Sequence, residues 1–301
     1  MIHKNLIIHF ALGLFFISIA ILSLPSCSNQ NTNPVESSSE EGITLSDQFS
    51  GEGTNSKSEL ITSEKVDRTI IAQYTFNEGS GRTLNDITEN SFDGLINKGA
   101  VWSTNGIDGF ALKFNKSGKV TFVNQQALNT IGETSYGTIS VWFYYSGIPS
   151  GQEMVPILYF GDDVYSSSQN CLVLEIGHPG NEFLYFTIIR NGIIIQCFDN
   201  NKTIQKNQWY HFAAVVSPTG NTGYINGVEL TNRHYNAGTL PSDTEFFSSI
   251  TKRDLMAFGY GTTGIASAFR YYNGLIDEIA IFNRPLQGAE ILQIYNSVLQ
   301  R

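Results

Sequence analysis

From residue 70 to the C-terminus the chain consists of short segments of strand composition, and this pattern restricts the fold most strongly. The segments are rich in β-branched and aromatic residues and are bounded by Gly, Asn, Asp and Pro. Asn191-Gly192 and Asn226-Gly227 predict two-residue hairpin turns, because such turns need positive φ at both central positions. Twelve strands without helices between them predict an all-β protein, an antiparallel two-sheet jelly-roll sandwich. The predicted strands are Ile70–Phe76, Ala111–Asn115, Lys119–Val123, Thr138–Tyr145, Val155–Phe160, Leu172–Ile176, Glu182–Arg190, Ile193–Phe198, Trp209–Val216, Gly223–Ile225, Leu255–Tyr260 and Leu275–Phe282.

The last stretch of the sequence has a helical pattern instead. Between Gln287 and Leu299, the residues Ile291, Tyr295 and Val298 recur at helical spacing and form one apolar face. This predicts a short C-terminal helix that packs on the sandwich. Neither an internal repeat nor a change of composition divides residues 69–301, so we expect one folded domain there.

The N-terminal residues 1–26 have the features of a targeting segment. Lys4 is followed by an apolar run from Leu6 to Leu24, long enough to span a bilayer. The run ends at Leu24-Pro25-Ser26-Cys27, which resembles a bacterial lipobox. The resemblance implies a cleaved signal peptide, a lipid on Cys27 and, with Ser28 next to it, the outer membrane of a bacterial cell envelope. An uncleaved signal anchor is the alternative.

Residues 27–68 are rich in Ser, Glu, Asn and Gly and show no period of 2 or 3.6 residues. Such a segment buries too little apolar surface to offset the entropy of ordering. We therefore expect a flexible tether with a span on the order of 35 Å, which would hold the domain at a distance from the membrane.

The charge of the chain argues against nucleic acid as a partner. Lys and Arg number 18 and Asp and Glu 27, which gives a formal net charge of −9, and no run of basic residues occurs. Binding of phosphate backbones requires clustered Lys and Arg side chains. Contact with a membrane is therefore expected through the lipid on Cys27.

Seven segments of the body resemble, in order and spacing, the bacterial laminin-G-like domains of the concanavalin A-like lectin/glucanase jelly-roll family. The resemblance spans the body of the chain and implies an antiparallel sandwich with a binding role, toward glycans, glycoproteins or other proteins. The segments are Tyr74–Gly81, Asp86–Gly94, Ala111–Phe114, Thr138–Phe143, Trp209–Val215, Tyr224–Gly227 and Gly274–Leu286.

The same resemblance implies a structural Ca²⁺ ion. Calcium binds carboxylate, amide and carbonyl oxygens, and the loop from Asp86 through Asn90 to Asp93 offers three such side chains. In the family the first strand lies beside the last, which would bring Asp277 close. We therefore predict Asp86 and Asp277 as ligands, with Asn90 and Asp93 as further candidates. The alternative is that Asp86 and Asn90 form Asx-turns and that Asp277 caps a strand end.

The sequence predicts a non-catalytic protein. Retaining glucanases of this fold carry Glu-x-Asp-x-x-Glu or a close variant on one strand, and no such motif occurs here. Asp162 and Asp163 are adjacent and would point to opposite faces of a strand. A glycoside hydrolase with an unrecognised site is kept as the least favoured alternative.

A carbohydrate-binding or adhesive module is the favoured function, and aromatic side chains are its expected contacts with a glycan. We single out Tyr260, Arg270, Tyr271 and Tyr272 as candidates. Of two neighbouring tyrosines in a strand, one must face the core. The alternative function is an interaction or scaffold lipoprotein that binds another envelope protein and has no sugar site.

Cys171 and Cys197 are expected to be buried free thiols. The turns near residues 178–181 and at Asn191-Gly192 place them on the two strands that flank residues 182–190, opposite about 188 and 186. Two strand spacings amount to about 9.6 Å, beyond the Cα separation of about 7 Å that a disulfide can bridge. A disulfide remains the alternative.

Overall fold

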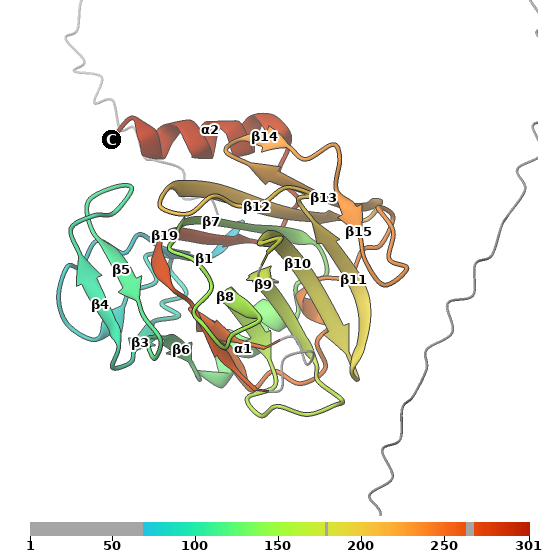
Figure 1. Ribbon diagram of the computed structural model, residues 1–301, viewed down its shortest axis with the longest axis horizontal. Helices are drawn as coiled ribbons and strands as arrows, with labels where there is room; N and C mark the ends of the chain where they lie inside the picture. Colours follow the sequence, from blue (N-terminus) through green and yellow to red (C-terminus); the bar gives the residue numbers. More distant parts are fainter. Residues whose placement is uncertain (1–68, 178–179, 263–267) are drawn as a thin grey trace, which may run out of the picture. The chain divides into compact units, whose positions relative to one another are not determined.

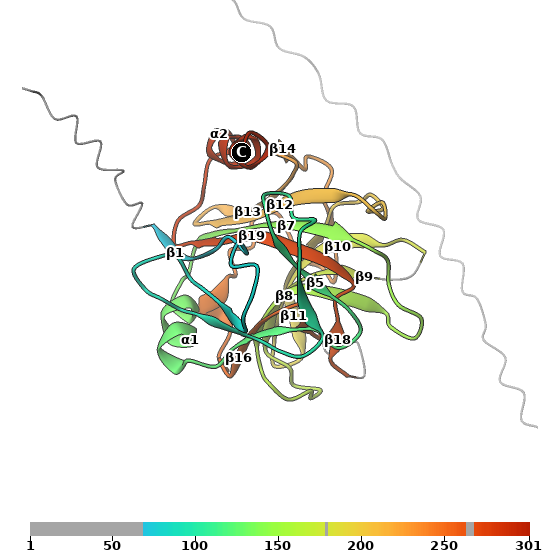
Figure 2. The same ribbon diagram turned by 90° about the vertical axis from the view of Figure 1, so that its left-hand side faces the viewer.

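The computed structural model describes residues 69–177, 180–262 and 268–301, which form two antiparallel β-sheets packed face to face (Figure 1). The predicted signal peptide (1–26), the predicted tether (27–68) and Cys27 lie outside the described residues. Seen from the side, α2 (Gly288–Leu299) lies over one sheet, and the second sheet lies beneath the first (Figure 2). The predicted antiparallel jelly-roll sandwich is confirmed.

The eight-stranded sheet carries the first and last long strands of the domain side by side. Ile70 of β1 pairs with Phe282 of β19, and Tyr74 pairs with Ile279. In spatial order the strands are β14 (Val228–Glu229), β13 (Gly220–Ile225), β12 (Trp209–Ser217), β7 (Gly137–Tyr145), β19 (Gly274–Phe282), β5 (Ala111–Phe114) and β4 (Ala100–Ser103), with β1 (Ile70–Tyr74) also paired to β19.

The nine-stranded sheet contains a meander of four consecutive long strands. In spatial order its members are β15 (His234–Tyr235), β11 (Ile193–Asp199), β10 (Phe183–Arg190), β9 (Cys171–Gly177), β8 (Met154–Gly161), β16 (Leu255–Phe258), β6 (Val120–Phe122), β3 (Gly94–Ile96) and β2 (Thr83–Leu84). The turn between β10 and β11 has φ of 52° at Asn191 and 77° at Gly192, and Asn226 and Gly227 have 52° and 76°. Both predicted hairpin turns are confirmed.

The main core lies between the two sheets, where alternate side chains of each strand point inward. Its aromatic centre brings together Tyr74 of β1, Phe122 of β6 and Phe258 of β16, with ring centroids 4.8 to 5.3 Å apart. All three side chains are almost completely buried. Packing of rings from both sheets holds the sandwich together, and the outer faces of the sheets remain available for other contacts.

Two helices complete the described part of the chain. The predicted C-terminal helix is confirmed as α2, which buries Ile291 and Val298. A second helix, α1 (Gln125–Gly132), was not predicted; Asn124 begins it by accepting hydrogen bonds from the backbone N–H groups of Gln126 and Ala127. A 3₁₀ turn, η1, covers Phe247–Ser249. Among the described residues, no helix has the length and apolar character needed to cross a bilayer.

The strand register confirms the prediction for the cysteines. Cys171 pairs with Ile189 and Cys197 with Thr187, each within one residue of the expected partner. They lie on β9 and β11, on either side of β10, and both are buried free thiols.

Candidate ligand-binding site

A short two-stranded sheet lies over the outer face of the nine-stranded sheet, against β8, and it carries two aromatic rings with a third beside them in Phe269. After β16 the chain turns at Gly259, whose φ is +71°, and continues as β17 (Tyr260–Gly261), which pairs with β18 (Arg270–Tyr271). A side chain at Gly261 would have its Cβ 2.8 Å from the Cβ of Tyr159, so glycine allows β17 to approach β8. This close approach places Tyr260 and its neighbours over the outer face of the sheet.

Tyr260, Phe269 and Tyr271 form what we call the aromatic platform. The rings of Tyr260 and Phe269 stack with centroids 4.8 Å apart and 14° between their planes, and Tyr271 lies 5.0 Å from Tyr260. Phe269 also meets Tyr159 edge-on at 5.6 Å. All three rings of the platform are partly exposed. The platform is therefore packed against Tyr159 through Phe269, and each of its three residues keeps part of its surface exposed.

Charged groups surround the platform. The Lys119 ammonium lies 4.0 Å from the centre of the Tyr260 ring, and partial burial lowers the pKa of Lys119. Arg270 forms an ion pair with Glu153 at 2.7 Å, and this contact lowers the pKa of the Glu153 carboxyl. Burial raises the pKa of Tyr260, with smaller contributions from Tyr271 and Asp163. The tyrosine therefore stays a neutral hydroxyl at physiological pH.

The structure brings together three of the four predicted ligand contacts, and Tyr272 is corrected to a core residue. Tyr272 has no exposed surface, packs edge-on against Phe114 and donates its hydroxyl hydrogen bond to the Tyr144 carbonyl at 3.0 Å. The alternation of side chains along the strand turns it inward while Tyr271 faces outward. Among the residues of the site, Phe269, Lys119 and Glu153 were not predicted.

Aromatic rings with hydrogen-bond donors and acceptors around them suit a polyhydroxylated ligand. Partly exposed tyrosine rings present an apolar surface for the C–H faces of a sugar together with a polar hydroxyl. Lys119, Arg270 and Glu153 lie within reach of hydroxyl groups around such a ring. Such an arrangement can bind and orient a ligand.

The predicted calcium ligands Asp86, Asn90 and Asp93 lie in one loop, where they bind protein groups. The Asp86 carboxylate accepts four hydrogen bonds, from the Gln73, Thr88 and Phe92 N–H groups and from the Thr88 hydroxyl, at 2.8 to 3.0 Å. Asp93 accepts from the Asp86 N–H at 2.9 Å, and Asn90 donates to the Ile71 carbonyl at 3.0 Å. These bonds fasten the loop to β1.

Asp277 binds a different loop. Its carboxylate accepts hydrogen bonds from the backbone N–H groups of Ile107 and Asp108, at 3.0 and 3.4 Å, and from that of Glu278 at 2.9 Å. Burial, followed by the neighbouring Glu278, raises the pKa of Asp277 to about 8. Asp277 therefore joins β19 to residues 107 and 108.

As arranged here, the donor set does not fit a cation at Asp86. An ionised carboxylate has about four acceptor positions, and those of Asp86 are all taken. In the residues that the structure describes, no group of three or more His, Cys, Asp or Glu is placed to hold a metal ion. Calcium stays a prediction from the family resemblance, and no functional step is derived through it.

One pair of carboxyls on the outer face of the nine-stranded sheet bears on catalysis. Glu175 of β9 and Asp199 of β11 both lie opposite Tyr185 of β10, two strand spacings or about 9.6 Å apart. Inverting glycosidases separate their carboxyls by about 6.5–9.5 Å. However, Glu175 is 6% exposed and Asp199 1%, so a sugar has no access between them. The pair does not form an open catalytic cleft.

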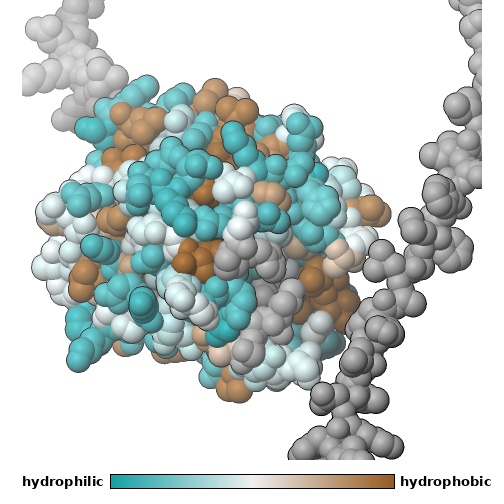
Figure 3. Space-filling view, viewed as in Figure 1, coloured by the Kyte–Doolittle hydropathy of each residue, from teal (hydrophilic) through white to brown (hydrophobic). Residues whose placement is uncertain are grey.

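The surface provides a further distinction between a glycan and a protein partner. Among the described residues on the face shown in Figure 3, hydrophobic side chains form separate patches among hydrophilic ones. A broad flat apolar area would be expected for a large protein interface. This face instead resembles an ordinary solvated surface.

The comparisons with known proteins find likeness in fold. Domain 4 of a GH43 extracellular arabinanase from Geobacillus stearothermophilus, solved in complex with arabinotriose, has a TM-score of 0.52 and 20% identity, over 75% of this chain and 98% of that one. The botulinum neurotoxin serotype C1 binding domain has a TM-score of 0.53 and 17% identity, over 76% of this chain and 52% of that one. A Trypanosoma rangeli sialidase in complex with sialic acid has a TM-score of 0.51 and 14% identity, over 76% and 33%. The search of curated proteins found no match.

At these identities the structural likeness shows the jelly-roll architecture alone. The sequence itself matches a family model over residues 114–292, more than half of the chain, from β5 to the first turns of α2. The matched region includes the meander of β8 to β11 and the aromatic platform. The chain therefore belongs to the Laminin_G_3 family, described as the concanavalin A-like lectin/glucanases superfamily.

Proposed function

We propose that residues 69–301 form a non-catalytic carbohydrate-binding module. The observation that carries this proposal is the aromatic platform, in which Tyr260, Phe269 and Tyr271 present stacked, partly exposed rings beside Arg270 and Lys119. Family membership supports a binding role. A relative of the same fold, the arabinanase domain, was solved with a bound arabinose oligosaccharide, and this suggests the first ligand class to test.

The proposal places the module on a lipid anchor at the bacterial cell envelope. The Leu24–Cys27 motif and the polar composition of residues 28–68 support it. A module on such a tether would bind glycans or glycoproteins near the membrane that carries it. Retention at the outer membrane, on either face, is part of this proposal.

The test is binding of the full chain, in a non-glycosidic detergent, to linear arabinan and to a glycan array. The variants Tyr260→Ala and Tyr271→Ala each remove a ring of the platform, and each is expected to lower affinity at least about tenfold, which corresponds to about 1.4 kcal/mol. Tyr136→Ala is the control, because Tyr136 is an exposed tyrosine that lies away from the platform, between α1 and β7. It is expected to bind as the unaltered chain does.

Three results would contradict the proposal. Binding that survives both platform substitutions would place the glycan site elsewhere. If the chain binds neither the array nor arabinan, the alternative of a protein partner in the envelope is favoured. Cross-linking on intact cells would then identify that partner. Hydrolysis products in the arabinan assay would point to the glycosidase alternative.

A further inference from the structure

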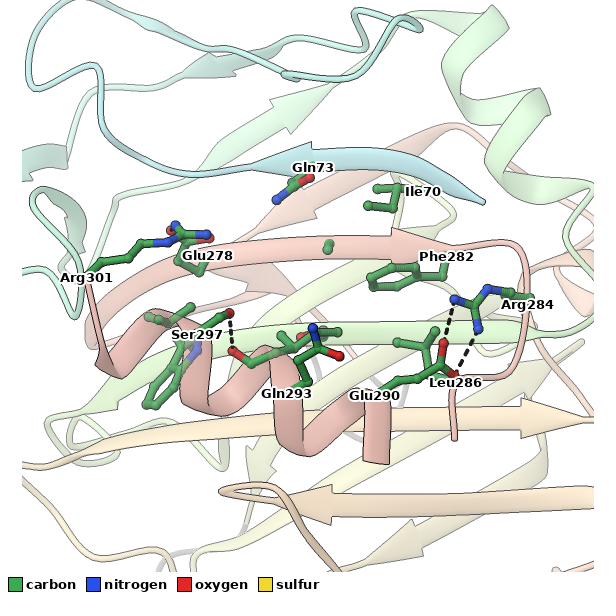
Figure 4. A pocket seen from close by; sticks show the side chains of 15 residues that line it. Ile70, Gln73, Glu278, Phe282, Arg284, Leu286, Glu290, Gln293, Ser297 and Arg301 are labelled. Atoms are coloured by element: carbon green, nitrogen blue, oxygen red, sulfur yellow. Dashed lines mark hydrogen bonds and ion pairs between the residues drawn. The ribbon is translucent and has the colours of Figure 1, made fainter. Parts of the chain in front are cut away.

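A second cavity lies on the opposite side of the molecule from the aromatic platform. It has a volume of about 290 Å³ and lies between α2 and the outer face of the eight-stranded sheet, where β1, β7 and β19 form its floor (Figure 4). Ligand pockets begin at about 300 Å³, so this cavity has room for one small molecule. Ile70, Phe282 and Leu286 give it apolar walls.

A tightly packed tryptophan lines this cavity. Trp142 of β7 is 2% exposed, and its buried Nε1 has no hydrogen-bond partner. Its ring is held in place by Tyr295 of α2, which stacks on it at 5.3 Å with 12° between the planes. Leaving a buried donor unpaired costs about 1–3 kcal/mol. Because Nε1 itself is covered, Trp142 borders the cavity through other atoms of its side chain and can report on a ligand there.

A carboxylate reaches the same cavity through an irregularity in β19. The register of β19 against β7 shifts between Asp277 and Ala280, and Glu278 within this bulge has φ of +47°. A positive φ is unfavourable for a residue with a side chain, and bulges of this kind redirect a side chain. Figure 4 shows Glu278 at the cavity beside Arg301, to which it is bound at 3.0 Å.

The charges around the cavity are already paired. Arg301 also binds Asp108 at 3.1 Å, and Arg284 binds Glu290 at 2.7 Å. A charged ligand would have to displace one of these partners and would leave a poorly solvated charge behind. The side-chain amides of Gln73 and Gln293 also face this space, and amides bind neutral hydroxyl groups. The lining therefore favours an uncharged, polar ligand.

We propose that this cavity binds a neutral polyhydroxylated molecule of monosaccharide size, whose hydroxyls donate to Glu278. The apolar walls contact the ring carbons, and Gln73 and Gln293 contact the remaining hydroxyls. The site is separate from the aromatic platform, and it stands or fails independently of the function proposed for that platform.

The test uses the full chain labelled with 5-fluorotryptophan, because the sequence contains three tryptophans and each gives one fluorine signal. Trp142→Phe identifies the signal of Trp142. D-Glucose, D-galactose and L-arabinose are then titrated separately. We expect at least one of them to shift the Trp142 signal saturably, with a dissociation constant on the order of millimolar.

Two variants on α2 form a matched pair. Ser297 lines the cavity and Ser297→Phe would fill it, whereas Asn296 lies next to it in sequence and outside the cavity lining. Ser297→Phe is expected to abolish the shift, and Asn296→Phe to leave it unchanged. Glu278→Gln is expected to weaken binding at least about tenfold, or about 1.4 kcal/mol.

The outcomes separate the two proposals. A Trp142 signal that none of the three sugars moves overturns the cavity proposal, and so does a shift that persists in Ser297→Phe. Tyr260→Ala is expected to lose polysaccharide binding while the Trp142 shift remains. If Tyr260→Ala removes the Trp142 shift as well, the two sites are not separate and the cavity proposal is overturned.

Discussion

Glu175 lies directly opposite Tyr185 on the outer face of the nine-stranded sheet, and its buried Oε2 has no hydrogen-bond partner. Burial raises the pKa of the Glu175 carboxyl from 4.5 to about 8. The uncharged carboxylic acid is therefore the favoured form in the folded domain at neutral pH. This places a titrating group on a sheet face where burial disfavours its charged form.

Glu175 is expected to make the domain less stable as pH rises. Its folded-state pKa exceeds its unfolded-state value, so its contribution is fully present below about pH 4.5 and is lost as pH rises through about 8. Each pKa unit corresponds to about 1.4 kcal/mol, so the loss is on the order of a few kcal/mol. Urea unfolding of the full chain and of Glu175→Gln at pH 5 and pH 8.5 measures it.

We expect Glu175→Gln to match the unaltered chain at pH 5 and to exceed its free energy of unfolding at pH 8.5. Thr187→Val, on the same face of β10, serves as a control that changes polarity without removing a titrating group. Parallel pH profiles for the unaltered chain and Glu175→Gln would show that Glu175 is ionised in the folded state at neutral pH.

Phe269→Ala is expected to weaken glycan binding even though Tyr260 and Tyr271 remain. The stacked Phe269 ring holds Tyr260 in place, and the loss of an aromatic pair costs about 0.5–1.5 kcal/mol beyond the buried area. A three- to tenfold rise in the dissociation constant for the ligand found on the array is anticipated. Phe269→Tyr, which keeps the stacking ring, is the control. Equal affinity for Phe269→Ala and Phe269→Tyr would exclude a positioning role for Phe269.

Asp86→Asn is expected to destabilise the domain whether or not calcium is present. An amide retains one acceptor oxygen in place of the two that bind three N–H groups and the Thr88 hydroxyl. Each buried hydrogen bond to a charged group contributes about 1.5–3 kcal/mol. Thermal unfolding of the variant and the unaltered chain in EDTA and in CaCl₂ separates the contribution of these hydrogen bonds from that of calcium.

The family resemblance predicts a lower melting temperature for the unaltered chain in EDTA, restored by CaCl₂. If EDTA leaves the melting curve unchanged and Asp86→Asn is destabilised, the loop that contains Asp86 is stabilised by hydrogen bonds alone. An Asp86→Asn variant as stable as the unaltered chain would contradict the structural role of Asp86.

Cys171 and Cys197 are expected to react with a thiol reagent only after unfolding. Their exposed fractions are 0% and 4%, and burial raises the pKa of Cys171 well above its usual value and that of Cys197 to about 11. The thiolate is the reactive form, so the low exposure and the raised pKa both protect these thiols in the folded domain. Titration with Ellman's reagent before and after addition of guanidinium measures this. Thiol reactivity at neutral pH without denaturant would mean that β9 and β11 open locally.

Cys27→Ser is expected to release the protein from the membrane fraction. The proposed lipid is attached through the Cys27 sulfur, which serine cannot replace. Incorporation of labelled palmitate into the unaltered chain, and its absence in Cys27→Ser, is the measurement. Cys197→Ser is the matched control and should still incorporate label. Membrane retention of an unlabelled Cys27→Ser chain would favour the uncleaved anchor.

The strands were predictable where local chemistry and the fold agree. All twelve predicted strands are present, and the Asn191-Gly192 turn placed Cys197 on the correct strand because it determines the register of β10 and β11. The strands β2 (Thr83–Leu84) and β17 (Tyr260–Gly261) have only two residues each, too few to show the alternating pattern of a strand. Helix α1 did carry a signal, in Asn124 and the apolar residues after it.

The candidate site was predictable only in part. Tyr260, Arg270 and Tyr271 could be selected by residue type, and Phe269 could have been added because it continues the same aromatic run. Lys119 and Glu153 come from distant parts of the chain and join the site through the pairing of β6, β16 and β8. The position of Glu278 was not predictable, because its positive φ opposes the intrinsic preference of glutamate.

The pairing of Ile70 with Phe282 has a consequence for how the protein is made. Strand β1 begins the sandwich, but its partner β19 is synthesised about 210 residues later. At translation rates of about 5–20 residues per second, that delay is on the order of 10–40 s. During that interval β1 cannot take its native place, and the central strands are exposed to wrong partners. A chain of this topology completes its fold only after nearly all of it has emerged, and any factor that shields nascent chains from aggregation would act in that interval.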